Sequence, residues 1–246
     1  MIELLINGAK GVFSPVITGE INLYTERWSM GELKFKVLKK GTSDFKEGNA
    51  VRLKVNNKNM FFGYVFSKSR TKEGIITVTC YDQLRYLKNK DTYTYTLKKA
   101  SDVVKMICDD YRIATGTIED TLYTIASRIE DNSTLFDIIY TALDLTRLYN
   151  GKEFVLYDDY GKITLKSVES LKTNLLINNE SAIDFDYKTT IDKNVYNKIK
   201  LLHKKDTKYI HIHNEYIASD TDKVKEWGTL QYYNCLLYTS DAADDK

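Results

Sequence analysis

The chain has 246 residues, of which 43% are hydrophobic, 12% aromatic and 28% charged, a composition typical of globular proteins. The 36 Lys and Arg residues against 34 Asp and Glu give a net charge of +2, which does not indicate a nucleic-acid or membrane-surface binder. No apolar run approaches the length of about 18 residues that a membrane helix needs, and the first residues do not have the pattern of a secretory signal. We therefore expect a globular protein of the cytosol, and the composition excludes fibrous, disulfide-rich and disordered classes.

Two residue counts favour a β-rich protein. The chain holds 19 tyrosines and a single proline, Pro15, where average usage of about 5% would give roughly a dozen prolines. Tyrosine is favoured in strands and at protein interfaces, so we expect a protein that assembles with others. The three cysteines, Cys80, Cys108 and Cys235, are not in CxxC spacing, which argues against a zinc site. Cys80 lies in an apolar run and is expected to be a small buried residue.

The first stretch, residues 1–97, shows the alternation of half-buried strands. Apolar and charged residues alternate at 33–37 and at 51–55. An asparagine-rich turn between two such runs predicts a β-hairpin over residues 50–66. Thr92–Thr96 alternates again, so this stretch predicts an antiparallel barrel or sandwich.

The pattern changes to a helical period within residues 98–186. Ser101 is placed as the N-cap of an amphipathic helix that ends at Tyr111. A second and stronger helix is expected to begin after Asn132–Ser133 and to end near Leu148, where Tyr149–Gly151 marks the stop. This stretch is predicted to be a small α+β domain.

Two more hairpins and a short helix follow from turn residues. The turn Asp158–Gly161 joins the strands of a hairpin over residues 153–166. A second hairpin is predicted over residues 196–216, followed by a short polar helix or turn at residues 220–226. Three elements are too few for an independent sheet domain, so residues from 187 on predict only the beginning of one.

Histidines offer one candidate metal site. His211 and His213 are two residues apart on a predicted strand, so their side chains share one face. A metal ion needs at least a third ligand, for which His203 and Glu215 are the nearest candidates. We interpret this face as a solvated strand surface and predict no metal site and no cofactor.

Adjacent carboxylates offer a candidate catalytic pair. Such pairs occur at Asp109–Asp110, Glu119–Asp120, Glu130–Asp131 and Asp158–Asp159. Glycoside hydrolysis needs two carboxyl groups about 5–9.5 Å apart across a cleft. Each pair is predicted to lie at a helix end or a turn, where solvation explains it.

Sequence motifs for catalysis and nucleic-acid binding do not support an enzyme. The chain has no GxSxG, HExxH or P-loop motif and no GxGxxG motif in a βαβ unit. The run Tyr81–Asp91 mixes aromatic and basic residues as nucleic-acid platforms do, but acidic residues and a leucine spine interrupt it. We interpret this run as a connecting turn with an internal Arg–Asp pair, and we predict no catalytic residues.

Several segments resemble one known family. The sequence is similar to the XkdQ/YqbQ family of tail proteins from PBSX-like defective prophages and contractile phages of Gram-positive bacteria. The similar segments are Phe61–Phe66, Tyr81–Asp91, Ser127–Asn132, Leu135–Ile139, Tyr157–Leu165 and Trp227–Tyr233. The resemblance covers residues 1 to 234 in order, and the run at 81–91 makes it specific.

This resemblance implies a baseplate hub without catalytic residues. Related hubs have two barrel-like β domains that form a trimeric ring and join a sixfold tail tube to a threefold central spike. The implied partners are further copies of the chain in a homotrimer, together with tail tube, spike and LysM-type tail proteins, with no nucleic acid and no membrane. The implied location is a virion or phage-tail-like particle that is assembled in the bacterial cytoplasm.

Two other function classes stay open. Some tail hubs are fused to peptidoglycan-degrading domains, so a tail-associated peptidoglycan hydrolase is one alternative. A cell-wall glycan-binding module is another, and it predicts exposed aromatic residues along a groove. Tyr93 and Tyr95 are the candidates for such residues.

The last segment departs from the family. Cys235–Asp244 looks like an in-frame translation of a transposase adapter used in preparing DNA sequencing libraries. Residues 235–246 are therefore expected to be a non-native tail that makes no native structure and ends a longer hub protein early. The strands within residues 195–216 are then expected to form an incomplete sheet with unpaired edges.

The sequence as a whole predicts an α+β protein that is mostly antiparallel β. We expect a barrel-like β domain at residues 1–97 and an inserted α+β domain at residues 98–186. The start of a second β barrel is expected at residues 187–234, followed by the tail at residues 235–246.

Overall fold

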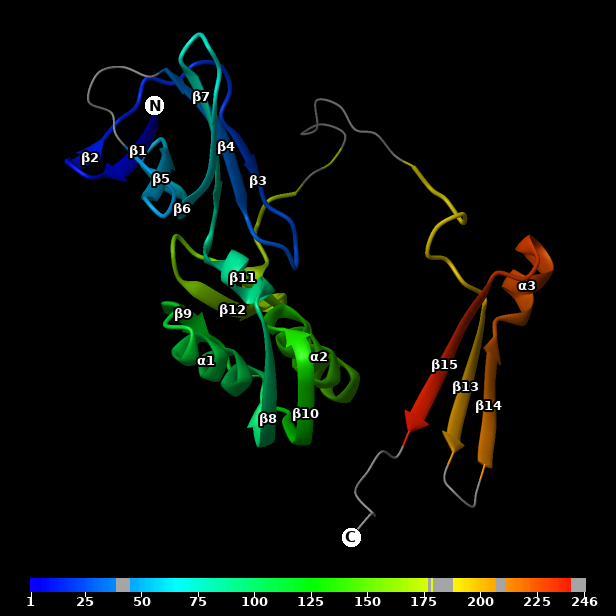
Figure 1. The fold of residues 1–246 in the computed structure, drawn as a ribbon. Coiled ribbons are helices and arrows are strands. Elements are labelled where there is room, and N and C mark those ends of the chain that lie inside the picture. Colours follow the sequence, from blue (N-terminus) through cyan, green and yellow to red (C-terminus); the bar gives the residue numbers. More distant parts are fainter. Residues whose placement is uncertain (39–44, 177, 179–187, 207–210, 240–246) are drawn as a thin grey trace. The chain divides into compact units, whose positions relative to one another are not determined.

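The computed structural model describes residues 1–38, 45–176, 178, 188–206 and 211–239. The chain forms two compact units, Met1–Asn174 and Leu175–Lys246, which Figure 1 draws as ribbons. None of the described helices is long and apolar enough to cross a membrane.

The first unit begins with an open antiparallel sheet of seven strands. The strands are β1 (Ile2–Gly8), β2 (Gly11–Phe13), β3 (Asn22–Tyr24), β4 (Glu32–Leu38), β5 (Ala50–Val55), β6 (Lys58–Arg70) and β7 (Ile75–Tyr81). Their order is β2-β1-β5-β6-β7-β4-β3, and within the described residues the end strands β2 and β3 do not pair. The mostly antiparallel β class is confirmed, but the sheet is not a closed barrel.

The alternation along these strands places a hydrophobic cluster on one face. Leu33, Phe35 and Val37 of β4 are buried, while the lysines between them point to solvent. The predicted hairpin of β5 and β6 is confirmed, with Asn56 and Asn57 at φ of 49° and 61°. Two successive positive φ values are those of a type I′ turn, whose twist suits a hairpin.

The second half of this unit combines helices with two small sheets. Its strands are β8 (Lys90–Lys99), β9 (Thr115–Ile118), β10 (Thr124–Thr134), β11 (Phe154–Asp158) and β12 (Ile163–Ser167). Its helices are α1 (Ala100–Asp110) and α2 (Leu135–Asn150), with short 3-10 helices η1 (Gln83–Lys88) and η2 (Glu169–Leu171). β11 and β12 form the predicted hairpin, and β9 adds to β12 in parallel. The sequence predicted that the alternating residues of β8 belong to the first sheet. This is wrong, because β8 pairs with β10 and not with the seven-stranded sheet.

The first helix starts earlier than predicted, and the second starts where it was expected. α1 is capped by Lys99, whose N–H donates to Asp102 over 3.0 Å, so the expected cap Ser101 lies inside the helix. The N-cap of α2 is Thr134, directly after Ser133, and its hydroxyl accepts the N–H of Asp137. The predicted stop is confirmed, since Gly151 ends α2 at a φ of 70°.

The second unit holds a three-stranded sheet. Its elements are β13 (Lys198–Asp206), β14 (His211–Ser219), α3 (Thr221–Trp227) and β15 (Gln231–Thr239). The antiparallel pairing of β13 with β14 and the short helix α3 confirm the predictions for this region. The turn between these two strands lies outside the described residues.

The expectation that residues from 235 on make no structure is wrong for part of that segment. Cys235 to Thr239 complete β15, which pairs in parallel with β13 from Lys198 to Asp206. Backbone hydrogen bonding needs no particular side chain, so a segment without clear periodicity still covers an open strand edge. β13 is therefore paired on both sides, whereas residues 240–246 lie outside the described residues.

A glycine in β6 tests this packing. A methyl group at Gly63 would overlap the carbonyl oxygen of Tyr81 and the ring of Phe61, so we expect Gly63→Ala to lower the free energy of unfolding by about 1–3 kcal/mol. Urea denaturation followed by circular dichroism measures this loss. Ser69→Ala, at an exposed position of the same strand, is the control and should change stability by less than about 0.5 kcal/mol. An unchanged midpoint for Gly63→Ala would contradict the described register of β6.

Candidate functional site at the junction of two lobes

Two separate hydrophobic clusters divide the first unit into lobes. One cluster lies on the seven-stranded sheet, and we call residues 1–82 the sheet lobe. The other gathers the inner sides of α1, α2, β11 and β12, and we call residues 83–174 the helical lobe. The turn at η1 leads from one lobe to the other, and its Leu84 and Leu87 are buried in the second cluster. The region around this turn is the candidate functional site.

Asp82 is the central residue of this junction. Its side chain is 6% exposed and accepts the N–H of Gly31 over 2.7 Å. The other carboxylate oxygen accepts the N–H of Leu84 over 3.0 Å, so Asp82 is the N-cap of η1. Its own N–H donates to the carbonyl oxygen of Gly31 over 3.1 Å. One aspartate therefore joins the loop before β4 to the first turn of the helical lobe.

A second acid lies on the opposite side of the same turn. Asp158, at the end of β11, accepts the N–H of Gln83 over 3.3 Å and the N–H of Gly161 over 2.6 Å. The side-chain amide of Gln83 donates to the carbonyl oxygen of Gly161. The turn of the β11–β12 hairpin is thus fastened to the start of η1.

Burial gives these two acids unusual protonation behaviour. Burial raises the pKa of Asp82 to about 7. The hydrogen bond from the N–H of Gly31 lowers this pKa, and the nearby Asp158 adds a smaller rise. Burial also raises the pKa of Asp158, and the N–H groups of Gly161 and Gln83 oppose that rise. No ion pair formed among the described residues includes either acid. A buried acid pair of this kind is compatible with proton chemistry, but each of the four carboxylate oxygens accepts a backbone N–H group.

Aromatic rings cover the outer side of the junction. The members of this aromatic cluster are Phe62, Tyr64, Phe66, Tyr81, Tyr86 and Tyr160. Phe62 and Tyr160 connect the two lobes at 5.9 Å between ring centroids, and Tyr64 and Tyr86 do so at 6.2 Å. The guanidinium of Arg85 lies over the ring of Phe66, 5.6 Å from its centroid. The internal Arg–Asp pair expected in this run is therefore wrong, since Arg85 contacts an aromatic ring while Asp82 binds backbone N–H groups.

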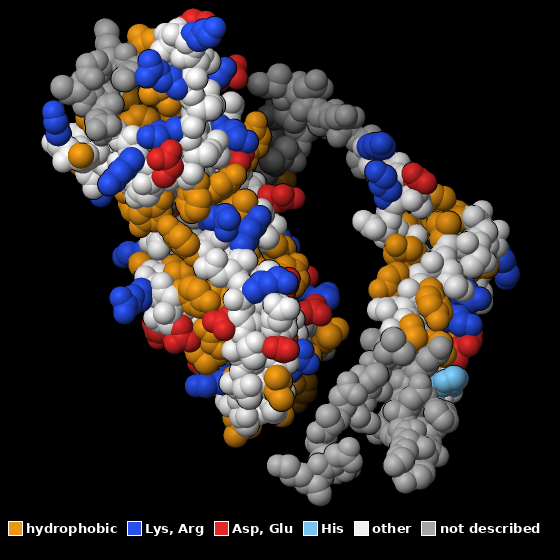
Figure 2. Space-filling model, in the orientation of Figure 1, with side chains coloured by type: hydrophobic (Ala, Val, Ile, Leu, Met, Phe, Trp, Pro, Cys, Tyr) orange, Lys and Arg blue, Asp and Glu red, His pale blue; other side chains and the backbone are white. Residues whose placement is uncertain are grey.

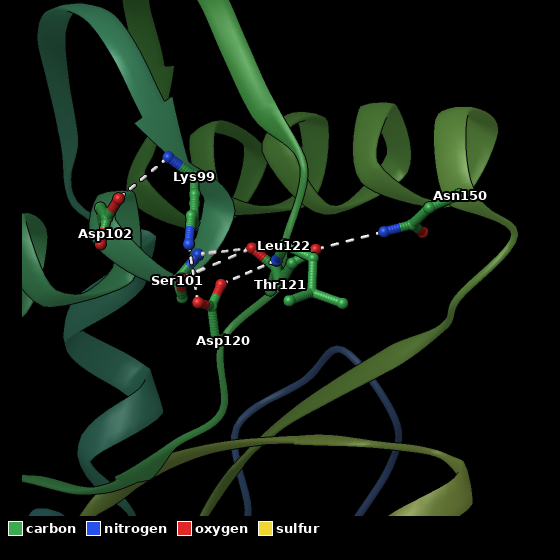
Figure 3. A network of polar contacts seen from close by, with 7 residues as sticks. All are labelled: Lys99, Ser101, Asp102, Asp120, Thr121, Leu122 and Asn150. Carbon is green, nitrogen blue, oxygen red and sulfur yellow. Dashed lines mark hydrogen bonds and ion pairs between the residues drawn. The ribbon is translucent and has the colours of Figure 1, made fainter.

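A polar network holds the far end of the helical lobe (Figure 3). Thr121 is fully buried; its hydroxyl accepts the N–H of Ser101 over 3.1 Å, and its carbonyl oxygen accepts from Asn150 over 3.2 Å. Lys99 pairs with Asp120 over 2.6 Å, and the hydrogen bond to Asp120 raises the pKa of the lysine. The hydrogen bonds of Thr121 therefore connect the start of α1 to the end of α2.

The predicted carboxylate pairs are structural in the described residues. Asp110 accepts the hydroxyl of Tyr93, and Glu119 accepts the N–H of Ser167. Glu130 is 8% exposed and pairs with Arg128 over 2.8 Å. The expectation that all four pairs are solvated turn residues is wrong, because Glu130 and Asp158 are enclosed by their partners.

The other candidates are also placed by the structure. Tyr93 and Tyr95 are 9% and 3% exposed and belong to the core of the helical lobe, so the expectation that they line a groove is wrong. Their alternation in β8 points them inward against α1 and α2. Cys80 is buried as predicted, and burial raises the pKa of its thiol to about 12. His213 is exposed, and no group of three possible metal ligands occurs among the described residues.

Charge on the visible surface is mixed. Figure 2 shows basic and acidic side chains interspersed over residues 1–174, with hydrophobic side chains between them. The surface drawn there therefore has no single-sign field of the kind that steers nucleic acids.

Comparison with known proteins places the chain in a family. The model of the family described as YQBQ-like matches residues 21–244. The chain belongs to the YQBQ-like family. The uncharacterized protein YqbQ of Bacillus subtilis (strain 168) is 32% identical over 240 residues, covering 94% of this chain and 72% of the relative. The phage-like element PBSX protein XkdQ of the same organism is 31% identical over 202 residues, covering 81% of this chain and 58% of the relative.

Solved structures share the fold of this YQBQ-like chain. The 43 kDa tail protein of prophage MuSo2 from Shewanella oneidensis matches with a TM-score of 0.66 at 13% identity, over 98% of this chain and 74% of its own. The tail protein from Neisseria meningitidis MC58 matches with a TM-score of 0.59 at 11% identity, over 98% and 72%. Prophage tail protein gp18 from Listeria monocytogenes EGD-e matches with a TM-score of 0.51 at 13% identity, over 96% and 72%.

Three of the segments that carry the family resemblance meet at the junction. Phe61–Phe66 provides the aromatic rings on β6, Tyr81–Asp91 provides η1, and Tyr157–Leu165 provides Asp158 and the hairpin turn. Leu135–Ile139 begins α2 beside them, since the N–H of Leu135 donates to the carbonyl oxygen of Asn89 over 2.9 Å. The sequence signal for this site was the family match and not a motif for chemistry.

The buried acid predicts a pH dependence of stability. The pKa of Asp82 is about 7 in the folded chain and about 3.8 in the unfolded chain. The contribution of the protonated acid to the free energy of unfolding is therefore complete below pH 3.8 and is lost as the pH rises through 7. We expect Asp82→Asn, which cannot ionise, to lose this part of the pH dependence, so that its stability relative to the unsubstituted chain rises between pH 4 and pH 8. This relative rise is at most about 4 kcal/mol, at about 1.36 kcal/mol for each pKa unit.

Urea denaturation at pH 4.5 and pH 8 measures this difference. Asp109→Asn, at an exposed position of α1, is the control and should leave the difference between the two pH values unchanged. If Asp82→Asn changes stability by the same amount at both pH values, the burial argument for Asp82 is wrong.

Proposed function

We propose that this chain is a structural protein of a phage tail or a phage-tail-like particle. The observation that carries the proposal is a shared fold over 96–98% of the chain with three tail proteins, two of which are prophage tail proteins. The family relation to XkdQ of the phage-like element PBSX supports the same function. The junction supports it as well, because its acids and aromatic rings join parts of the chain and leave no assembled catalytic group.

The finer proposal is a baseplate hub. In this role full-length copies form a trimeric ring that joins the tail tube to the central spike, beside LysM-type tail proteins. A closed ring of heterologous contacts avoids open filaments and requires adhesive surfaces on each subunit. In the second unit no hydrophobic residue is buried among those whose side chains the structure describes, 175–176, 178, 188–203 and 213–235, while Tyr216, Ile217 and Tyr233 are all more than half exposed. Such side chains favour association with another protein surface.

An enzymatic function is the alternative with less support. In each of the four carboxylate pairs at least one member is held, Asp110 by Tyr93, Glu119 by the N–H of Ser167, Glu130 by Arg128 and Asp158 by backbone N–H groups. A catalytic pair needs one carboxyl group on each side of an accessible cleft. We propose a non-enzymatic chain, and reproducible cleavage of peptidoglycan that a single carboxylate substitution abolishes would contradict this.

Particle composition tests the tail function. We expect the chain to co-purify with tail particles at fixed stoichiometry, and deletion of its gene to leave no complete tails in electron micrographs. Peptide mass spectrometry of gradient-purified particles measures the first result. Complete particles without the chain would contradict the proposal.

Light scattering tests the trimer. We expect a full-length member of the family, such as YqbQ, to show three times the monomer mass at high concentration. A monomer at all concentrations would contradict the trimeric ring. It would not contradict the tail function, which the particle experiment tests separately.

A further inference from the structure

A mixed aromatic and charged pocket lies where the loop before β4 rests on the helical lobe. The pocket has a volume of about 260 Å3, and its walls come from the loop, from α2 and from the start of β11. Its lining includes Arg27, Trp28, Tyr140, Asp144, Arg147 and Glu153. None of them belongs to the Asp82 junction or to the aromatic cluster.

Two aromatic rings form the apolar part of this pocket. The centroids of Trp28 and Tyr140 lie 4.2 Å apart, with their planes inclined by 52°. Tyr140 is 41% exposed, so this aromatic wall is open to a ligand. Trp28 has a φ of 66°, a left-handed conformation that is unfavourable for a bulky residue. Strained backbone of this kind clusters at ligand-binding sites, where the surrounding structure holds a side chain in place.

Two ion pairs form the polar part. Arg27 pairs with Glu153 over 3.2 Å, and Arg147 pairs with Asp144 over 2.8 Å. The four side chains are each 46–51% exposed, so each keeps hydrogen-bonding capacity toward the pocket. A guanidinium has five N–H donors and a carboxylate about four acceptor positions, of which these pairs use only a part. The pocket thus presents planar donors and acceptors with a net charge of zero.

This combination selects the class of ligand. An anion or a cation would meet a like charge in one of the two pairs, and a purely apolar ligand would cover charged groups without binding them. A sugar ring satisfies both parts, because its C–H face packs on aromatic rings while its hydroxyls both donate and accept. The volume lies just below the roughly 300–1,000 Å3 of pockets for drug-sized ligands, which fits one ring. We propose that this pocket binds a single neutral pyranose ring.

Saturation-transfer NMR tests the proposal on the whole 246-residue chain, with N-acetylglucosamine and its linear trimer as probes. We expect saturation transfer to the ring protons of the sugar at millimolar concentration. Tyr140→Ala should weaken binding roughly threefold to tenfold, because it removes one aromatic ring from the wall. Tyr149→Ala is the matched control, since Tyr149 is on the same helix, is 74% exposed and stacks on Tyr123 outside the pocket.

A second variant tests the proposal if Tyr140→Ala does not fold. Asp144→Asn keeps the shape of the side chain and removes its charge, so it leaves the fold in place and should weaken binding by disturbing the Arg147 pair. Tighter binding of the trimer identifies the end of a glycan chain as the source of the ring, and equal binding identifies a free monosaccharide. No saturation transfer to either probe, or equal transfer in the Tyr140→Ala and Tyr149→Ala chains, would overturn the proposal. This test is independent of the particle experiment on the tail function.

Discussion

The hydrogen bonds between Asp82 and Gly31 are the constraint on which the first unit depends. They hold the end of β7 against the loop before β4, and the same carboxylate starts η1 by accepting the N–H of Leu84. Once η1 has this direction, Leu84 enters the core of the helical lobe and Gln83 reaches the hairpin turn near Gly161. Because the carboxylate is buried, these bonds carry a cost in desolvation, which appears as its raised pKa.

Close approach makes glycine necessary on both sides of this joint. A methyl group at Gly31 would overlap the carboxylate of Asp82, and one at Gly161 would overlap the ring of Phe62. Gly161 also has a φ of 89°, a conformation that side chains rarely adopt. The resembling segments 61–66, 81–91 and 157–165 are far apart in the chain, but all three contribute residues to this one junction.

Local features were predictable from the sequence, and features that depend on distant partners were not. The Asn56–Asn57 turn and the Gly151 helix stop follow from residues beside them, so their predictions are confirmed. The pairing of β8 with β10, and with it the burial of Tyr93 and Tyr95, depends on a strand some thirty residues away, as the pairing of Tyr95 with Arg128 shows. The proximity of Asp82 and Asp158 could not be predicted either, because no local pattern relates the end of β7 to the end of β11.

Native-state hydrogen exchange in increasing denaturant, measured by mass spectrometry, tests most directly whether the Asp82 junction makes the two lobes unfold as one cooperative unit. The account predicts that the slowest amides of β6 in the sheet lobe and of α2 in the helical lobe open with the same free energy and the same dependence on denaturant. The amide of Gly31, which is bonded to Asp82, should open with them. Separate opening of the two lobes, with different free energies, would contradict the account.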